Sequence, residues 1–368
     1  TTSIESRDKM TRVKKIRYRS KLGDMPSYDV VEREWKVKVN ANECGMNLPP
    51  MVEDRVMGRL SRVAFNRYPN EDLEQLMESI ADNYGLKKEN VLIGNGSSEI
   101  IEKLFFAFGG RNLTVVYPQP SFSMYHIYAK AAEARSVVVE LNKEDYSLNV
   151  REFIQTVNDA KASLAVVCNP NNPTGNALSL EDIENIAQHT SCALLIDEAY
   201  VEFYGQSAAS LLKKYPKLLV ARTFSKAYGL AAIRCGYLLG DAEVIAMVAK
   251  TFMPYHMDVL TLVTADTVFQ MRDEYVPRIQ QMIAERNRMS ELYASLPGFK
   301  VYPSQTNFIL VKYEKAVPLN EELVNMSIGV RSFGSAPGLE NCLRISMGTR
   351  QENDQVFDAI KSFAEANQ

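Results

Sequence analysis

Seven short apolar segments within residues 91–239 constrain the fold of this chain more than any other feature. Each is almost continuously apolar, as expected for strands that are covered on both faces. The expected strands are Val91–Gly94, Thr114–Tyr117, Val137–Leu141, Leu164–Cys168, Ala193–Asp197, Leu218–Thr223 and Cys235–Leu239. Amphipathic helical patterns lie between them, at Glu99–Phe108, Phe122–Ala132, Val150–Val157 and Leu180–Gln188. This alternation predicts an α/β fold with a mostly parallel seven-stranded sheet and helices on both sides.

The pattern changes after Met257, where a long helical region is expected to reach about Leu296 and to stop at the following Pro-Gly pair. The later expected elements are the strands Lys300–Tyr302, Asn307–Lys312, Gly329–Arg331 and Leu343–Ser346 and a closing helix from Glu352. This pattern indicates a smaller α+β domain. We expect an N-terminal arm that also contributes to the small domain over residues 1–45, a large domain over 46–265 and a small C-terminal domain over 266–368.

Composition argues against several classes of protein. The 368 residues include 42 Lys and Arg against 45 Asp and Glu, a balance that disfavours nucleic-acid and anionic-membrane binders. No apolar run approaches the roughly 20 residues that span a bilayer. Three histidines and five unpaired cysteines predict no metal site and free thiols in a reducing compartment, the cytoplasm. The basic residues within 9–21 are expected to form a solvated arm, or one that lies across a partner subunit.

Polar loops follow several of the expected strands, at the sheet edge where open α/β folds bind ligands. Gly94–Glu99 (GNGSSE) joins a strand to a helix, and its glycines and free N–H groups suit a phosphate. Ser97 or Ser98 as a simple N-cap is an equal alternative. Asn169–Gly175 (NPNNPTG) forms a rigid turn with more side-chain amides than a turn requires, which suggests a positioned hydrogen-bond donor.

Two charged residues also follow buried strands. Asp197 ends the run Ala-Leu-Leu-Ile, where a carboxylate is costly without a cationic partner. A structural salt bridge is the alternative to a functional role. Lys226 lies in Thr223–Tyr228 (TFSKAY), just beyond an apolar strand, a setting that lowers the pKa of an amine and makes it nucleophilic. An ordinary surface lysine is the alternative there.

Together and in this order, these loops resemble the fold-type I pyridoxal-phosphate (PLP) aminotransferases, with the nearest likeness to the histidinol-phosphate aminotransferases. The resemblance covers nearly the whole chain, because it includes Asn40–Glu43 (NANE), Asn66–Pro69 (NRYP) and Leu343–Ser346 (LRIS). It implies a PLP-dependent transaminase of histidine biosynthesis. Such an enzyme exchanges an amino group between L-histidinol phosphate and 2-oxoglutarate by a ping-pong mechanism.

The resemblance also implies roles for the residues around the cofactor ring. Lys226 would bind PLP covalently and later carry the proton, Asp197 would pair with the pyridine nitrogen, and Tyr200 and Asn172 would hydrogen-bond the ring's 3-oxygen. Phe122 would stack on the ring, where many relatives have Tyr; a plain core aromatic is the alternative. The catalytic set is therefore Lys226, Asp197 and Tyr200.

Further roles concern the cofactor phosphate and the substrate. The groups implied for the phosphate are Gly96, Ser97, Ser225 and Arg234. Tyr68 would reach the phosphate of the neighbouring subunit, which makes the active unit a homodimer. Arg344 would bind the donor carboxylate and Arg331 the anionic tail of the substrate, with an ion-paired surface arginine as the alternative for Arg331. The implied substrate set is Arg344, Arg331, Tyr28 and Asn172.

Two departures from the family pattern leave the substrate open. Asn42–Gly45 (NECG) stands where relatives often have Asn-Glu-Asn-Pro, and Ser98 stands where many have Asp. An aromatic aminotransferase on the same frame is one alternative, since the aromatic residues near the substrate side suit either substrate, namely Tyr18, Tyr28, Tyr125 and Phe333. A threonine-phosphate decarboxylase is the other, because its substrate also carries two anions.

Overall fold

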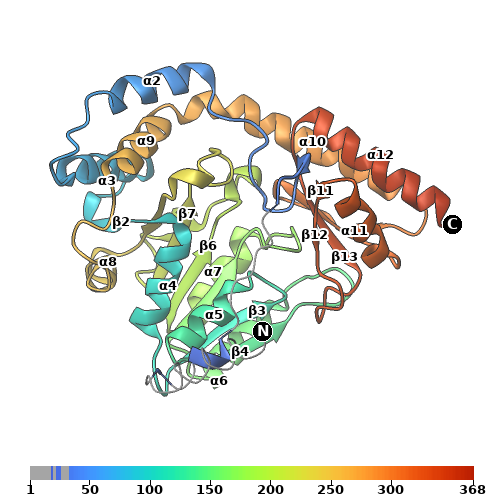
Figure 1. The fold of residues 1–368 in the computed structure, drawn as a ribbon. Coiled ribbons are helices and arrows are strands. Elements are labelled where there is room, and N and C mark those ends of the chain that lie inside the picture. The colour runs from blue at the N-terminus through green and yellow to red at the C-terminus, as the bar shows by residue number, and fades with distance from the viewer. Residues whose placement is uncertain (1–17, 20–21, 26–32) are drawn as a thin grey trace, which may run out of the picture.

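A computed structural model describes residues 18–19, 22–25 and 33–368, and a seven-stranded sheet dominates it (Figure 1). The strand order is β2-β8-β7-β6-β5-β3-β4. The strands are β2 (Val91–Gly94), β3 (Thr114–Gln119), β4 (Arg135–Glu140), β5 (Leu164–Cys168), β6 (Ala193–Asp197), β7 (Leu218–Thr223) and β8 (Gly236–Leu239). All pair in parallel except β8, which is antiparallel to both β2 and β7. The prediction of a mostly parallel seven-stranded sheet is confirmed, with one reversed strand.

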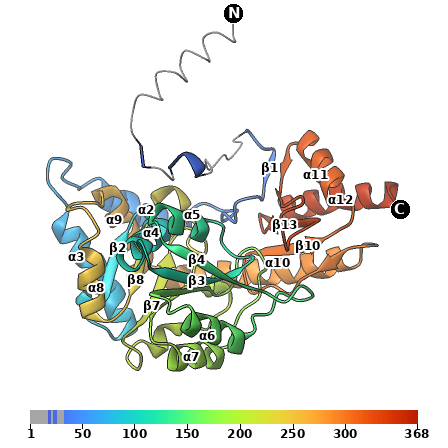
Figure 2. The same cartoon turned by 90° about the horizontal axis from the view of Figure 1, so that it is seen from below.

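Helices cover both faces of this sheet, because side chains alternate along each buried strand. In β6, Leu194 and Ile196 belong to the apolar cluster on one face and Leu195 to the cluster on the other. One face carries α4 (Gly96–Phe108), α5 (Met124–Ala131) and α8 (Ala242–Ala249). The other carries α2 (Pro50–Leu60), α3 (Asn70–Tyr84), α6 (Val150–Asp159), α7 (Leu180–His189) and α9 (Val259–Gln270). Figure 2 shows α4 and α5 on one side of β3 and β4, with α6 and α7 on the other.

The C-terminal part differs in detail from its prediction. The helical region after Met257 divides into α9 and α10 (Val276–Ala294), with a short 3-10 turn (Arg272–Tyr275) between them. Pro277, at the start of α10, cannot continue a preceding helix, which explains the break. The small antiparallel sheet has the order β12-β13-β10-β9. Its strands are β9 (Lys300–Val301), β10 (Phe308–Lys312), β12 (Arg331–Ser332) and β13 (Cys342–Ser346), and its neighbours include α11 (Ala316–Asn325) and α12 (Arg350–Ala366).

The expected strand Gly329–Arg331 is divided between two sheets. Its first part belongs to β11 (Ile328–Gly329), which pairs in parallel with β1 (Val37–Lys38), and its last residue begins β12. Val37 and Val39 lie in the apolar cluster of the small sheet. The segment before α2 therefore packs with elements close to the C-terminus.

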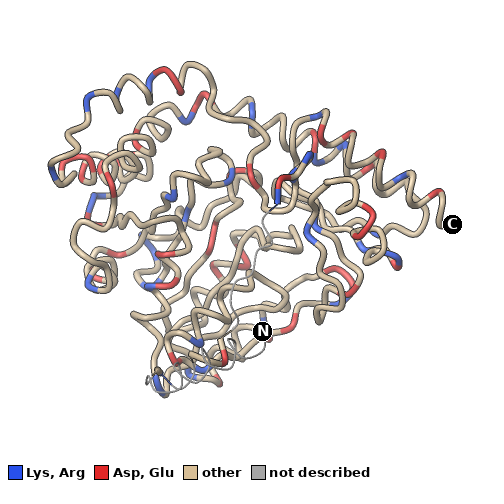
Figure 3. Tube along the Cα trace, viewed as in Figure 1, with Lys and Arg blue, Asp and Glu red and all other residues tan. Residues whose placement is uncertain are grey.

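Surface charge and cysteine state agree with the composition. Lys and Arg are interspersed with Asp and Glu along the described chain (Figure 3). All five cysteines are free thiols and all but Cys44 are buried, as predicted. Within the part of the chain that the structure describes, no helix combines the length and apolarity needed to cross a bilayer. Arg19 is the one described basic residue of the 9–21 stretch, and it forms an ion pair with Glu133 at 2.9 Å.

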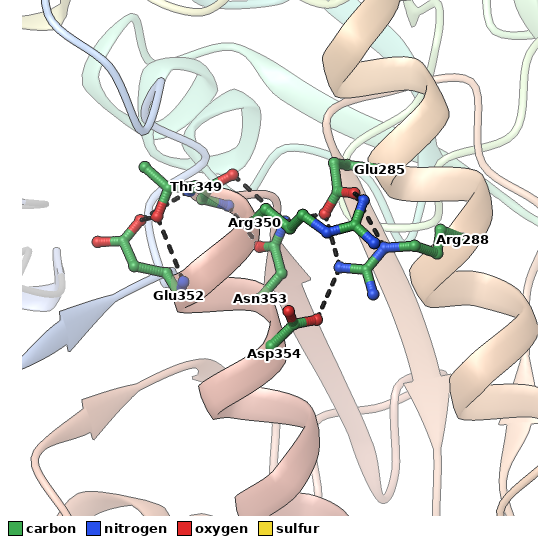
Figure 4. Close-up of polar contacts among 8 residues, drawn as sticks. Glu285, Arg288, Thr349, Arg350, Glu352, Asn353 and Asp354 are labelled. Carbon is green, nitrogen blue, oxygen red and sulfur yellow. Dashed lines mark hydrogen bonds and ion pairs between the residues drawn. The ribbon is translucent and has the colours of Figure 1, made fainter.

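A polar network fixes the start of α12 against α10 (Figure 4). Arg288 donates through Nε and Nη2 to both carboxylate oxygens of the buried Glu285, each at 2.9 Å. Asn353 and Arg350 donate to the same carboxylate at 3.0 and 3.3 Å. Thr349 caps α12 through the N–H of Glu352. Since α12 begins four residues after β13, this network holds the turn that follows that strand.

Glu285→Ala is expected to destabilise the fold by about 2 kcal/mol, because it removes the shared acceptor of three donors. Hydrogen bonding from Arg288 lowers the pKa of Glu285. Its contribution is therefore complete above the ordinary carboxyl pKa and is lost as the pH falls toward the lower folded value. Urea unfolding at pH 7 and pH 4 measures both effects. Glu365→Ala, which removes an exposed pair with Lys361 on the same helix, should cost less than roughly 0.5 kcal/mol. Equal losses in the two variants would refute the role of the network.

Candidate active site

The sheet topology brings the predicted loops to one edge. The strands β2, β5, β6 and β7 all end there, and the reversed β8 begins there. Gly236 pairs with Gly94 on one side and with Thr223 on the other. Cys168 pairs with Asp197 in the same way. The loops that follow these residues therefore start side by side.

Asp197 is a buried carboxylate with one unused oxygen. It is 3% exposed, and the Tyr125 hydroxyl donates to its Oδ2 at 2.5 Å. Oδ1 has no hydrogen-bond partner among the described residues. Burial raises the pKa of this carboxyl to about 6, against the lowering effect of the Tyr125 hydrogen bond. An unused oxygen on a buried acid suits a cationic ring N–H.

Among the residues that the structure describes, no cation forms a salt bridge with Asp197. The neighbouring carboxylate, Glu198, takes the buried cation instead, since Arg222 Nη1 lies 3.4 Å from its Oε2. Arg222 Nη2 also lies 3.1 Å from Glu202. This cluster pairs Arg222 with two carboxylates, and among the described residues Asp197 keeps the Tyr125 hydroxyl as its side-chain partner.

Lys226 carries an amine that is suited to nucleophilic attack. Its side chain is half-buried, and Nζ donates to the carbonyl oxygen of Ala41 at 2.9 Å. Burial, together with the positive charge of Arg344, lowers the pKa of Lys226 to about 8. Near neutral pH a useful fraction of the amine is therefore uncharged. The reading of Lys226 as an ordinary surface lysine is wrong.

Three further ring-side candidates lie in contact with other site residues. The buried Tyr200 hydroxyl accepts a hydrogen bond from Asn42 Nδ2 at 2.9 Å. Asn172 Oδ1 accepts one from Arg344 Nη1 at 2.6 Å, so a large-sheet loop meets β13. Phe122 packs edge-to-face on Tyr125, with ring centroids 5.5 Å apart. The side chain of Phe122 thus adjoins the residue that holds Asp197.

The GNGSSE loop forms a cradle. Helix α4 begins at Gly96 with Asn95 as N-cap, so Ser97 and Ser98 lie in its first turn and the N-cap interpretation of them is wrong. A Cβ atom on Gly96 would lie 2.6 Å from Arg234 Nη2. Arg234 Nη1 in turn lies 3.5 Å from Ser225 Oγ. Free N–H groups at a helix start beside a guanidinium fit a phosphate dianion.

The remaining candidates lie farther out or outside the described residues. Arg331 on β12 is directly opposite Arg344 in the strand register, and its exposed guanidinium lies 5.8 Å from the ring centroid of Phe333. Tyr68 is 72% exposed and stacks on Tyr255 with centroids 4.0 Å apart. Tyr28 lies outside the described residues.

Sequence reasoning missed two residues of the site. Tyr125 is predicted only as an aromatic near the substrate, although its place three residues after Phe122 in an expected helix (Phe122–Ala132) would have put the two side chains close together. Asn42 was considered only as part of a motif. Its backbone φ of 56° and its full burial became visible only in the structure.

Fold and site together define a class of enzyme. Residues 35–360 match the family described as aminotransferase class I and II. The chain belongs to this family, and it is a PLP-dependent transaminase. The unused oxygen of Asp197, the amine of Lys226 and the cradle at Gly96 fit this cofactor.

The relatives narrow the class to one branch. A protein of Clostridium novyi (strain NT) named histidinol-phosphate aminotransferase is 35% identical over 344 residues, which cover 94% of this chain and 96% of that protein. A Pyrococcus furiosus protein of the same name is 33% identical, with 92% and 95% covered. The predicted resemblance to this branch is confirmed.

Solved structures establish the fold. Histidinol-phosphate aminotransferase from Sinorhizobium meliloti, in complex with pyridoxal-5′-phosphate, has a TM-score of 0.85 at 23% identity, covering 96% of this chain and 98% of that one. L-threonine-O-3-phosphate decarboxylase from Porphyromonas gingivalis has a TM-score of 0.78 at 22% identity, with 89% and 99% covered. The predicted fold-type I architecture is confirmed.

Proposed function

We propose that this enzyme transfers the amino group of L-histidinol phosphate to 2-oxoglutarate, forming imidazole-acetol phosphate and L-glutamate. One observation carries the proposal beyond the family, namely the arginine pair Arg331 and Arg344 on adjacent strands. An enzyme that alternates between a phosphate-bearing amine and a dicarboxylate needs two anion sites close together. The names of relatives that are 33–36% identical over most of the chain support the same substrate.

The large-sheet loops would hold the cofactor. Lys226 would bind its aldehyde carbon, and Asp197 would place a negative charge beside the ring nitrogen. Tyr200 and Asn172 would bind the 3-oxygen, and Phe122 would lie against the ring. The phosphate would be held by the N–H groups of Gly96 and Ser97 and by the side chains of Ser225 and Arg234. When bound, PLP supplies an electron sink for negative charge on the substrate carbon.

Lys226 would also move the proton. Its free amine would be the base that removes the proton from the substrate carbon bearing the amino group. Burial and Arg344 keep its pKa at about 8, so that it both accepts and returns a proton near neutral pH. The Ala41 carbonyl, 2.9 Å from Nζ, is the acceptor that holds the amine in the structure.

Arg344 and Arg331 would divide the substrate anions. Arg344 is held by Asn172 Oδ1 and by the carbonyl of Asn40, at 2.6 and 2.9 Å, and would bind the carboxylate of glutamate. Arg331, one strand away and exposed, would bind the phosphate tail. Tyr28 would complete the phosphate side.

We further propose that two copies of the chain form the working enzyme, in the cytoplasm. Tyr68 and the neighbouring Phe65 are 72% and 79% exposed, and the stacked Tyr255 adds to this apolar surface. A second copy would bury these rings and would let Tyr68 reach the partner's cofactor phosphate. The free thiols fit a reducing compartment.

Arg331→Ala is expected to lower kcat/KM for histidinol phosphate by on the order of 10²-fold, since a charge-assisted phosphate contact is lost. The half-reaction with phenylalanine, which carries no second anion, should change much less. Stopped-flow half-reactions with each amine measure the difference. Arg135→Ala, at an exposed arginine on the edge strand β4, should affect neither reaction. Equal losses with both amines would remove the phosphate role from Arg331.

A substrate panel tests the reaction itself. The enzyme, loaded with amino groups from glutamate, is offered imidazole-acetol phosphate or phenylpyruvate, and the PLP form is incubated with threonine phosphate. We expect rapid turnover of imidazole-acetol phosphate only. Preference for phenylpyruvate would instead indicate an aromatic aminotransferase, and CO2 release from threonine phosphate would indicate a decarboxylase.

A further inference from the structure

The segment of residues 40–42 connects the two halves of the site. It follows β1, which pairs with the C-terminal strand β11. It leads toward α2, which packs on one face of the large sheet. Its three successive carbonyl oxygens accept hydrogen bonds from side chains of both parts of the molecule. The bonds are Arg344 Nη2 to Asn40 (2.9 Å), Lys226 Nζ to Ala41 (2.9 Å) and Asn307 Nδ2 to Asn42 (3.0 Å).

Asn42 uses all of its polar groups inside this junction. It is 1% exposed and has a φ of 56°, a conformation that asparagine tolerates better than most residues. Its N–H donates to Ser346 Oγ at 2.9 Å, and Ser346 Oγ donates back to its Oδ1 at 2.8 Å. This exchange fixes the orientation of the amide. The NH2 group therefore faces Tyr200, whose hydroxyl lies 2.9 Å from Nδ2.

The Tyr200 hydroxyl is consequently available as a hydrogen-bond donor. It accepts the Asn42 amide hydrogen, so its own hydrogen must be directed to another acceptor. Burial raises the pKa of Tyr200, in spite of the opposing charge of Arg344, and so keeps the hydroxyl protonated. Asp197 and Cys168 are the other titratable groups close to it, and both act in the same direction as burial.

We propose that Asn42 is a positioning residue that makes Tyr200 a hydrogen-bond donor to the 3-oxygen of the cofactor ring. The proposal rests on the proposed role of Tyr200. Ser346 donates to the side-chain amide of Asn42 and Asn307 donates to its backbone carbonyl, so Asn42 ties the hydroxyl to the small sheet that carries Arg344. Movement of that sheet toward a bound carboxylate would therefore bear directly on the group that tunes the cofactor.

The test measures the pH midpoint of the absorbance change of the PLP-loaded enzyme. A hydrogen-bond donor to the 3-oxygen stabilises the anionic form of that oxygen. Loss of the donor therefore raises the pH midpoint of the absorbance change. Tyr200→Phe should raise it by about one pH unit, the size expected for a hydrogen bond to a charged group. Asn42→Gly should raise it by roughly half a unit. Glycine is chosen because it accepts the backbone conformation without strain.

A double variant separates a positioning role from a general disturbance. Adding Asn42→Gly to Tyr200→Phe should leave the midpoint where Tyr200→Phe alone puts it, because the amide would act only through the hydroxyl. Ser346→Ala should give a smaller upward shift of the pH midpoint. It replaces Asn42→Gly in the test if that variant does not fold. Asn112→Gly is the matched control, since Asn112 is exposed and has a φ of 67°.

The outcomes separate this proposal from the proposed function. If Tyr200→Phe shifts the midpoint and Asn42→Gly and Ser346→Ala do not, the positioning role is wrong. An equal shift from Asn42→Gly with and without the Tyr200 hydroxyl also overturns it. If Tyr200→Phe itself leaves the midpoint unchanged, the assignment of Tyr200 to the ring fails first, and the proposal fails with it.

Discussion

Lys226→Ala is expected to reduce turnover by on the order of 10⁴-fold, because one side chain serves both as the covalent attachment and as the proton carrier. The pKa of about 8 and the contact with Ala41 describe an amine that is prepared for both tasks. The purified variant should also lack the visible absorbance of PLP bound through a lysine. Steady-state rates and a spectrum of the same preparation measure both losses.

The proton-carrying part of this loss can be tested separately. A small primary amine supplied in solution can replace the missing base but not the tether, so it should restore a fraction of the activity that grows with amine concentration. Lys213→Ala removes an exposed lysine and should leave rate and spectrum unchanged. Full turnover by Lys226→Ala would contradict the chemistry assigned to this residue.

Asp197→Asn should have opposite effects on activity and on the stability of the cofactor-free protein. The asparagine keeps an acceptor for Tyr125 but carries no charge to balance a protonated ring nitrogen, so turnover should fall by roughly 10²- to 10³-fold. Burial holds the pKa of Asp197 at about 6 instead of 3.8. The charged form is therefore unfavourable in the folded protein without cofactor.

The sign of the stability change follows from that pKa. The unfolded chain ionises near pH 3.8, so the penalty in the folded state appears as the pH rises from there to about 6 and is constant above. Asp197→Asn should remove roughly 2–3 kcal/mol of destabilisation at pH 7 and almost none at pH 3.5. Urea unfolding of the cofactor-free proteins measures this, with Asp54→Asn at an exposed position of α2 as the control. A less stable variant at pH 7 would show that the charge of Asp197 is already compensated.

The strands of the large sheet were predictable because burial on both faces leaves an apolar run with little ambiguity. Pairing direction was not, since β8 is as apolar as its parallel neighbours and the connection from β7, residues 224–235, is long enough for either direction. The division of Gly329–Arg331 between two sheets depends on β1, almost 300 residues earlier in the chain. Such long-range pairing leaves no local pattern.

The site was predictable where a residue is unusual for its surroundings. Asp197 and Lys226 stood out because charge is rare at the end of an apolar strand. Tyr125 and Asn42 did not, since a tyrosine on a buried helix face and an asparagine in a loop are ordinary. What distinguishes them is the partner each one meets in space, Asp197 for one and Tyr200 for the other.

The reversal of β8 constrains the spacing between Lys226 and Arg234. Since β7 and β8 are antiparallel neighbours, the connection between them leaves the sheet edge and returns to it, and both Lys226 and Arg234 lie on this one excursion. If these residues grip opposite ends of one small molecule, the contour of residues 227–233 determines the length it accepts. Insertion of a single residue there would change the spacing between Lys226 and Arg234 without replacing any residue of the site.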